Sequence, residues 1–253
     1  MKVAFVFSGL IRDLDTTSEV LIRKINELGA DVFASFWDIE KDNDTVNNFV
    51  KLFKPKRIEV ESWSDFEKST LKYHQDEIKF VDDLHLNFYD LITSARAHAM
   101  WYRIWRGNLL TKCDDYDVVV RLRTDLILSD KFNVEINDYL NFPHGGCQIT
   151  HWKGCYGPHD LIFYGKPELM DYATMVYQYI PKYISQDQYY FPSENLLRHH
   201  LSLKDINIRF YGDSVWLRDG GNSKRNEPDL EDEFVNTSEW IFDTDPQYSF
   251  KRN

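Results

Sequence analysis

Three charged residues with regular spacing, Arg121, Arg123 and Asp125, interrupt the largely apolar segment 116–128. If this segment is one β-strand, the three side chains share a face, because successive residues of a strand point to opposite sides. Burying these charges without partners would cost several kcal/mol each. They therefore form either a structural cluster of ion pairs or the wall of a polar site.

The polar-site interpretation has a definite chemistry. Guanidinium groups such as those of Arg121 and Arg123 bind phosphate oxygens through paired hydrogen bonds. A carboxylate such as that of Asp125 is a suitable oxygen ligand for a hard divalent cation, Mg²⁺ or Mn²⁺. A nucleotide carrying a diphosphate would use both kinds of group.

A second group of polar residues follows the first predicted strand. Ser8, Gly9 and Arg12 combine a small hydroxyl residue, a glycine and a cation, and free backbone N–H groups there can receive part of a nucleotide. The segment matches neither the GxGxxG dinucleotide motif nor a GxxxxGK(S/T) P-loop, which disfavours an NAD enzyme or a P-loop kinase. The alternative is an ordinary turn between a strand and a helix.

The N-terminal segments that would position these residues alternate between strand and helix. Segments 2–7, 32–37 and 58–63 have strand patterns, and segments 16–28 and 46–53 have amphipathic helix patterns between them. Such a βαβαβ unit forms a parallel sheet with helices on its faces. Nucleotides bind this architecture at the carboxyl ends of the strands.

The rest of the chain extends this α/β, Rossmann-like fold, with a mostly parallel sheet flanked by helices. Segment 89–110 predicts a long, buried helix, which leads into segment 116–128, predicted as a single strand. Further strands are predicted at 147–151, 160–164, 206–210 and 215–217, and further helices at 167–180 and 193–203.

Composition excludes several classes of protein. A net charge of −11 disfavours general binding to nucleic acid. No apolar run reaches the roughly 20 residues of a membrane helix, and Met1 to Leu10 does not resemble a signal peptide, so a cytoplasmic protein without a membrane span is expected. Cys113, Cys147 and Cys155 include no CxxC pair, which disfavours a disulfide framework or a cysteine-rich zinc site.

Several ordered motifs resemble the GT-A-like glycosyltransferase-related proteins of large viruses and bacteria. The resemblance covers about the first half of the chain and continues more loosely beyond it. Its motifs are FSGLIR, ADVFASFW, SARAHAMWYRI and YDVVVRLRTDL, followed by GPHDLIFYGKPELM and FPSENLLRHHL.

The resemblance implies a site for a nucleotide-diphosphosugar donor, with roles for particular residues. Asp125 stands where GT-A enzymes have the DxD motif that binds Mn²⁺ or Mg²⁺, but Arg123 replaces the first acid and can itself neutralise the diphosphate. Glu194 is similar in placement to the general base of many inverting GT-A enzymes, with Asp187 in reserve. Alternatively, Glu194 caps a helix.

The expected organisation is a GT-A-like domain over residues 1–219 and an acidic extension over 220–253. Residues 1–128 would bind the donor, and residues 129–219 would form an elaborated acceptor part. The expected activity is transfer of a sugar to a hydroxyl on a glycan or another acceptor. Two alternatives remain open: a non-catalytic module that binds nucleotide sugars or carbohydrates, and another nucleotide-dependent transferase or phosphohydrolase.

Overall fold

A mixed eight-stranded sheet forms the centre of the molecule, with the strand order β12-β10-β6-β9-β4-β1-β2-β3. The computed structural model describes residues 1–38, 43–69, 94–143, 146–148, 156–185, 193–211, 215–217 and 233–236. The strands of this sheet are β1 (Val3–Gly9), β2 (Asp31–Asp38), β3 (Arg57–Ser62), β4 (Val118–Leu122), β6 (Tyr139–Phe142), β9 (Ile162–Gly165), β10 (Asn207–Phe210) and β12 (Glu233–Asn236).

Two small sheets and several helices complete the described elements. The small sheets pair β5 (Leu126–Leu128) with β11 (Val215–Leu217), and β7 (Gly146–Gln148) with β8 (Tyr156–Pro158). The helices are α1 (Leu14–Leu28), α2 (Asn43–Phe53), α3 (Trp63–Ser69), α5 (Ser94–Leu110), α6 (Pro167–Thr174), α7 (Val176–Ser185), α8 (Ser193–Ser202) and the 3-10 helix Thr111–Cys113.

The N-terminal half of the sheet is parallel, as the βαβαβ pattern predicts. β2 and β4 lie on either side of β1, with Phe5 paired to Val32 and to Val120, and β3 follows β2. β1 is buried from Val3 to Ser8, which is typical of a strand covered on both faces. The α/β fold is thereby confirmed, with a Rossmann-like arrangement of its first four strands.

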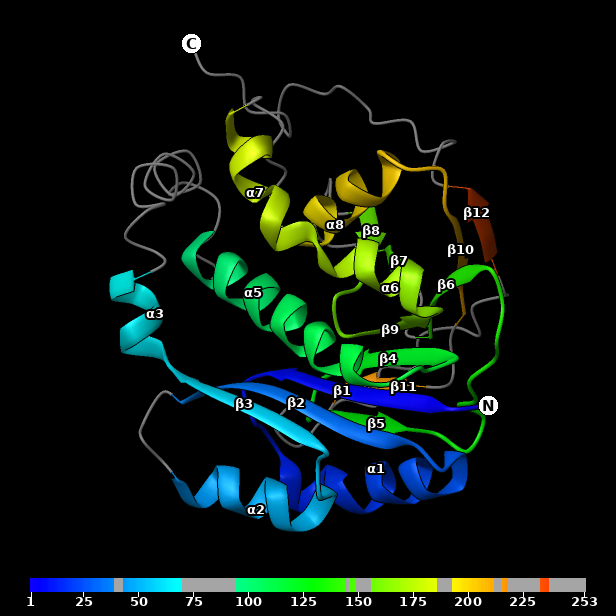
Figure 1. Cartoon of the computed structure of the whole chain (residues 1–253). Helices are drawn as coiled ribbons and strands as arrows, with labels where there is room; N and C mark the ends of the chain where they lie inside the picture. Colours follow the sequence, from blue (N-terminus) through cyan, green and yellow to red (C-terminus); the bar gives the residue numbers. More distant parts are fainter. Residues whose placement is uncertain are drawn as a thin grey trace.

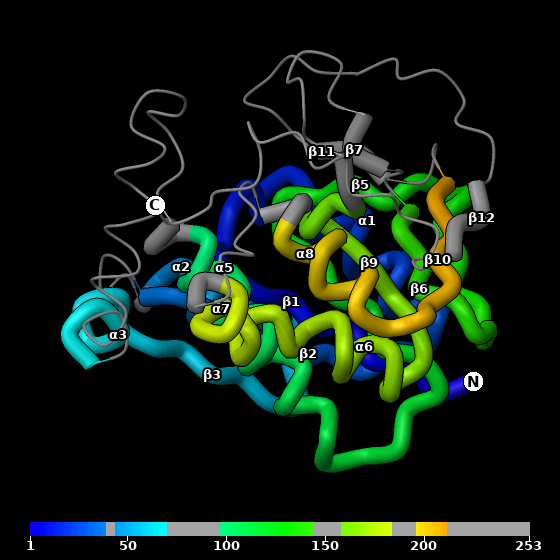
Figure 2. The backbone as a smooth tube through the Cα atoms, turned by 90° about the horizontal axis from the view of Figure 1, so that it is seen from above, coloured from blue at the N-terminus to red at the C-terminus, as the bar shows by residue number. Residues whose placement is uncertain are grey.

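Helices cover both faces of the sheet (Figure 1). α1 and α2 pack on one face around a core that includes Phe7 and Phe49, whereas α5 packs on the other face. α6 and α7 lie against α5, and α8 lies beside α6 and α7, as the view from above shows (Figure 2). The second core, around Trp101 and Phe163, joins these helices to the sheet. No helix in the described part of the chain combines the length and apolarity needed to cross a membrane.

The sequence predicts the C-terminal end of α1 correctly but not its N-terminal end. Gly29 ends the helix with φ 60°, and the N–H of Ala30 donates to the carbonyl of Ile25 at 2.9 Å, a Schellman arrangement that favours glycine. The spacing of Thr16 and Glu19 predicts a capping box, but the helix begins earlier, at Leu14. The Thr16 hydroxyl instead donates to the carbonyl of Asp13 at 2.9 Å.

The C-terminal half of the sheet departs from the predicted pattern. β9 runs antiparallel to both β4 and β6, and β12 runs antiparallel to β10. β6, β8 and β12 had no clear sequence signal. The helix predicted over 167–180 is two helices, α6 and α7, separated at Met175. The hydroxyl of Thr174 donates to the carbonyl of Asp171 at 3.3 Å, and such local bonds compete with helical ones.

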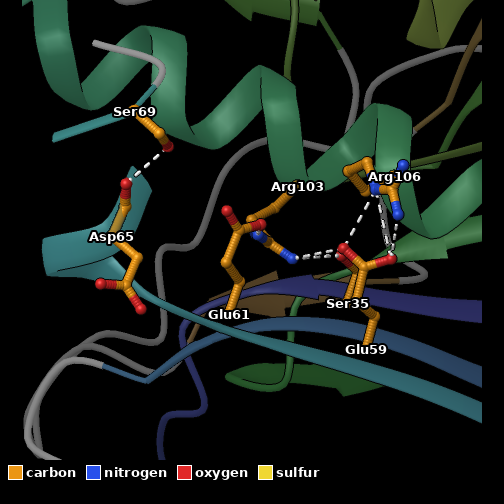
Figure 3. A network of polar contacts seen from close by, with 7 residues as sticks. All are labelled: Ser35, Glu59, Glu61, Asp65, Ser69, Arg103 and Arg106. Atoms are coloured by element: carbon orange, nitrogen blue, oxygen red, sulfur yellow. Dashed lines mark hydrogen bonds and ion pairs between the residues drawn. The ribbon is translucent and has the colours of Figure 1, made fainter. Parts of the chain in front are cut away.

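A network of charges around the buried Arg103 fixes α5 to the edge strand β3 (Figure 3). Arg103 of α5 has no exposed surface and donates hydrogen bonds to Glu59, at 3.0 Å, to Glu61, and to the hydroxyl of Ser35, at 3.2 Å. Arg106, one helical turn further, binds both carboxylate oxygens of Glu59, with Nε donating to Oε1 at 3.0 Å and Nη2 donating to Oε2 at 2.6 Å. Each carboxylate therefore has a guanidinium partner, and this network is a structural one.

A buried histidine joins α8 to α6 and α7. Nε2 of His200 lies 2.7 Å from the carbonyl oxygen of Tyr172, and Nδ1 lies 2.6 Å from the hydroxyl of Tyr183. Because a carbonyl only accepts, Nε2 carries the proton and Nδ1 accepts from Tyr183. Burial lowers the pKa of His200 to about 4, so the ring is neutral at neutral pH.

This histidine predicts a loss of stability in mild acid. The folded-state pKa lies below the unfolded value of about 6.5, so the unfolded chain takes up the proton first, and stability falls as the pH drops from about 6.5 towards 4. Between pH 7 and pH 4.5 we expect His200 to contribute a loss of about 2–3 kcal/mol. Its surroundings are Tyr172, Tyr179, Tyr183 and His199, none of which is anionic at these pH values. Urea unfolding at both pH values measures the effect, and His200→Gln should remove this contribution, while His199, whose pKa burial also lowers to about 4, keeps its own; an unchanged slope would contradict this assignment.

Candidate functional site

The candidate site lies at the carboxyl ends of β1 and β4, where the direction of strand order reverses. From β1 the chain adds β2 and β3 on one side of the sheet, and it then returns to place β4 on the other side of β1 (Figure 1). Open α/β sheets bind their ligands outside the strand ends at such a switch point. The residues predicted from the sequence to bind a donor lie in the last residues of these two strands or shortly after them.

β4 ends at Leu122, so the single strand predicted over 116–128 is wrong. Arg123 and Asp125 lie in the connection between β4 and β5, and only Arg121 lies on a strand of the central sheet. The connection is held by Thr124, whose hydroxyl accepts from the backbone N–H of Arg12 at 2.8 Å. This contact brings the segment after β1 against the segment after β4.

The carboxylate of Asp125 forms ion pairs with two guanidinium groups, those of Arg123 and Arg12. Arg123 donates to both of its carboxylate oxygens, with Nε 2.9 Å from Oδ1 and a second bond to Oδ2. Nη1 of Arg12 lies 3.9 Å from the same Oδ2. Burial alone would lower the pKa of Arg123, but the hydrogen bonds to Asp125 raise that pKa above its ordinary value. Arg123 and Asp125 are therefore an ion pair in this structure.

Arg121 differs from its neighbours because its charge is buried without a bonded carboxylate. The residue is 2% exposed, and its Nε donates to the hydroxyl of Ser8 at 3.0 Å. Its Nη1 is buried and, within the described part of the chain, has no hydrogen-bond partner. Burial lowers the pKa of Arg121 to about 10, with a partly opposing effect of Asp160, so the group stays charged at neutral pH.

Comparison with Arg103 shows how unusual this arrangement is. Both arginines are almost completely buried, but Arg103 binds two carboxylates, whereas among the described residues none forms an ion pair with Arg121. Buried charges are normally paired, because an unpaired charge retains its cost of desolvation. Arg121 therefore has the character of a residue that is completed by an anionic ligand.

Gly9 leaves space beside this arginine at the end of β1. Its φ of +109° is a conformation that residues with side chains rarely adopt, and a Cβ atom added there would have no neighbour within 4 Å. Ser8, which precedes it, is buried and holds Arg121. The structure thus places Ser8, Gly9 and Arg121 together.

Asp160 is a further member of the site that the sequence did not reveal. It is buried, and it acts electrostatically on Arg12, Arg121 and Arg123. Its position follows from β9, which runs antiparallel to β4 with Ile162 opposite Leu122. The sequence pattern did not reveal that β9 pairs antiparallel with β4, and this pairing is what places Asp160 near the end of β4. Three guanidinium groups face the carboxylates of Asp125 and Asp160 and, beside Arg12, that of Asp13, so the described charges at the site balance.

The described residues do not fit a divalent cation at Asp125. Both carboxylate oxygens accept hydrogen bonds from Arg123, and a cation there would face neighbouring guanidinium groups. Within the described ranges, no three His, Cys, Asp or Glu side chains gather as a metal-binding group. The groups at this site that can neutralise an anion are the guanidinium groups of Arg12, Arg121 and Arg123.

The side chains of the two candidates for a general base lie outside the described residues. Asp187 lies outside the described residues. Glu194 is the second residue of α8, but its side chain is outside the description. α8 packs against α6 and α7 on the C-terminal side of the fold.

A scan against models of protein families finds no match for this chain, and a search of curated proteins finds none either. Function is therefore inferred from the geometry of the residues at the ends of β1 and β4.

Proposed function

We propose that this protein is a glycosyltransferase of the GT-A type. It transfers a sugar from a nucleotide-diphosphosugar donor to a hydroxyl group of a glycan or another acceptor. The observation that carries the proposal is Arg121, a buried guanidinium at the switch point of the sheet to which no described carboxylate is bonded. Its natural complement is a phosphate group.

A diphosphate suits the arrangement better than a single carboxylate ligand. Arg121 is buried on the central strand β4. The side chains of Arg12 and Arg123 are partly exposed and lie closer to solvent. Cations at two depths can each bind one phosphate of a diphosphate. The leaving group of sugar transfer from such a donor is a nucleoside diphosphate, whose developing charge these groups would stabilise.

In the proposed reaction, a carboxylate on the acceptor side removes the proton of the attacking hydroxyl. The acceptor oxygen forms a bond to the anomeric carbon as the bond from that carbon to the diphosphate oxygen breaks. The electron pair of the broken bond leaves with the nucleoside diphosphate, beside Arg121 and Arg123. We assign the base to Glu194 on α8, with Asp187 as the second candidate, so that residues 1–128 bind the donor and residues 129–219 the acceptor.

The activity is tested by incubating the protein with UDP-, GDP- and dTDP-sugars and a mixture of hydroxyl acceptors. Sustained release of free nucleoside diphosphate over many turnovers is expected, and Arg121→Gln should abolish it. Arg23→Gln is the matched control, since Arg23 lies on the surface of α1, paired with Asp130 at 2.9 Å. Binding of a nucleotide sugar without any turnover would instead identify a binding module.

Substitution of Glu194 separates the chemical step from donor binding. We expect Glu194→Gln to lower kcat by about two orders of magnitude or more, because amide cannot accept the acceptor's proton. The Kd for the donor should change less than about threefold, since the base acts on the acceptor. Asp187→Asn is the comparison, and if it alone shows this pattern, Asp187 is the base. Normal turnover in both variants would refute both assignments.

A further inference from the structure

Resting on the proposed function, a further inference concerns how the charge of the donor is neutralised. We propose that this site binds the donor diphosphate without a divalent cation, through the guanidinium groups of Arg12, Arg121 and Arg123. Asp125 is then a positioning residue that holds Arg123, and it is not a metal ligand.

The first argument is the hydrogen-bonding state of Asp125. Its two oxygens accept from Nε and from the terminal nitrogen of Arg123, which is the paired geometry that arginine and carboxylate prefer. A cation bound to this carboxylate would have to displace that pair and leave Arg123 beside a like charge. Asp125 is itself buried, so neither partner can be moved into water without cost.

The second argument is the balance of charge around Arg121. Among the described residues, Nη1 of the buried Arg121 has no hydrogen-bond partner, and Asp160 acts on the guanidinium electrostatically without an ion pair between them. The described charged groups at this site, which are Arg12, Arg121, Arg123, Asp13, Asp125 and Asp160, therefore balance to zero before any ligand binds. An anion can enter this site directly, without a cation to reverse the sign of the local charge.

The third argument is the graded exposure of the three arginines. Arg121 is held by Ser8, the side chain of Arg123 is 25% exposed, and that of Arg12 is 49% exposed. The inner guanidinium is fixed before binding, and the outer Arg12 is free to move towards a phosphate. The N–H of Arg12 remains bound to Thr124 at 2.8 Å, so its backbone stays in place.

The test measures binding of UDP, GDP, dTDP and inorganic pyrophosphate by titration calorimetry, once in EDTA and once in Mn²⁺. The wild-type protein is expected to bind at least one nucleoside diphosphate in EDTA, with a Kd that Mn²⁺ changes less than about threefold. Arg121→Gln should weaken this binding roughly 30-fold or more. The surface variant Arg23→Gln should bind like the wild type.

Asp125 provides the discriminating variants. Asp125→Asn should weaken binding by about 3–10-fold through loss of the fixed position of Arg123, and equally in EDTA and in Mn²⁺. Asp125→Glu, which keeps a carboxylate for Arg123, should restore part of the affinity. A metal ligand would behave differently, because Asp125→Asn would then remove the response to Mn²⁺.

The outcomes distinguish this inference from the proposed function. Binding in EDTA that depends on Arg121 supports both. Binding that requires Mn²⁺ and loses that requirement in Asp125→Asn overturns the cation-free site but leaves the proposed function standing. No binding of any probe in either condition overturns both.

Discussion

Arg121→Gln is expected to weaken donor binding strongly without destabilising the ligand-free protein. Binding of the nucleoside diphosphate should weaken roughly 30-fold or more, because each hydrogen bond to a charged group contributes about 1.5–3 kcal/mol. The melting temperature should stay the same or rise, since the variant removes a buried charge that has no bonded carboxylate. Glutamine keeps a donor for the hydroxyl of Ser8. Calorimetry and thermal unfolding of the same sample measure the two effects.

The combination of these two results is what identifies a ligand site. A merely structural arginine would lower stability on substitution and would affect binding only through partial unfolding. If Arg121→Gln lowers the melting temperature as much as a substitution of Arg103 does, Arg121 has a structural role, and the site must be sought elsewhere.

Arg103→Met is expected to produce the largest loss of stability among single substitutions in the charged networks. It removes the guanidinium between Glu59 and Glu61 and leaves Glu61 without that partner beneath α5 (Figure 3). Breaking a buried ion pair in this way costs about 3–5 kcal/mol. For a protein of this size, the melting temperature should fall by roughly 6–20 °C. Urea unfolding measures the free energy directly.

Two companion variants test the reason for this loss. Arg106→Met removes the other, more exposed guanidinium bound to Glu59 and should cost only about 1 kcal/mol. The double variant Arg103→Met with Glu61→Leu should recover part of the loss, because an apolar pair leaves no carboxylate unpaired. Equal losses for Arg103→Met and Arg106→Met would show that burial of the charge is not the cause.

The Glu59 carboxylate adds an acid dependence to the same network. Burial by itself would raise the pKa of Glu59, but the hydrogen bonds from Arg106 lower it below its ordinary value. A lowered folded-state pKa gives stability that is present above about pH 4.5 and is lost as the pH falls further. This loss lies at lower pH than the effect of His200, so the two are separable in one pH series.

The parallel half of the fold was predictable from the sequence because its signals are local. Buried strands such as β1 and β2 are continuous apolar runs, and Gly29 ends the helix between them through its own backbone conformation. The antiparallel strand β9 was recognised as a strand, but its place between β4 and β6 depends on contacts with distant residues. Short strands such as β6 obtain their stability from these neighbours, and their own pattern is weak.

The sequence predicted most of the residues that belong to the candidate site, but it did not predict which of them form ion pairs with each other. The spacing of Arg121, Arg123 and Asp125 left two interpretations open, an ion-pair cluster or the wall of a polar site. The structure shows an ion pair between Arg123 and Asp125, and an arginine beside them without such a pair. The break after β4 explains this difference, because Thr124 accepts its bond from Arg12, 112 residues away. No local pattern contains that contact.

The most direct measurement is a crystal structure of the protein with the nucleoside diphosphate that binds best in EDTA. A phosphate oxygen is predicted to lie about 2.7–2.9 Å from Nη1 of Arg121, with the Arg123–Asp125 pair still formed. A diphosphate bound away from the ends of β1 and β4, with Arg121 still bonded only to Ser8, would contradict the proposed site.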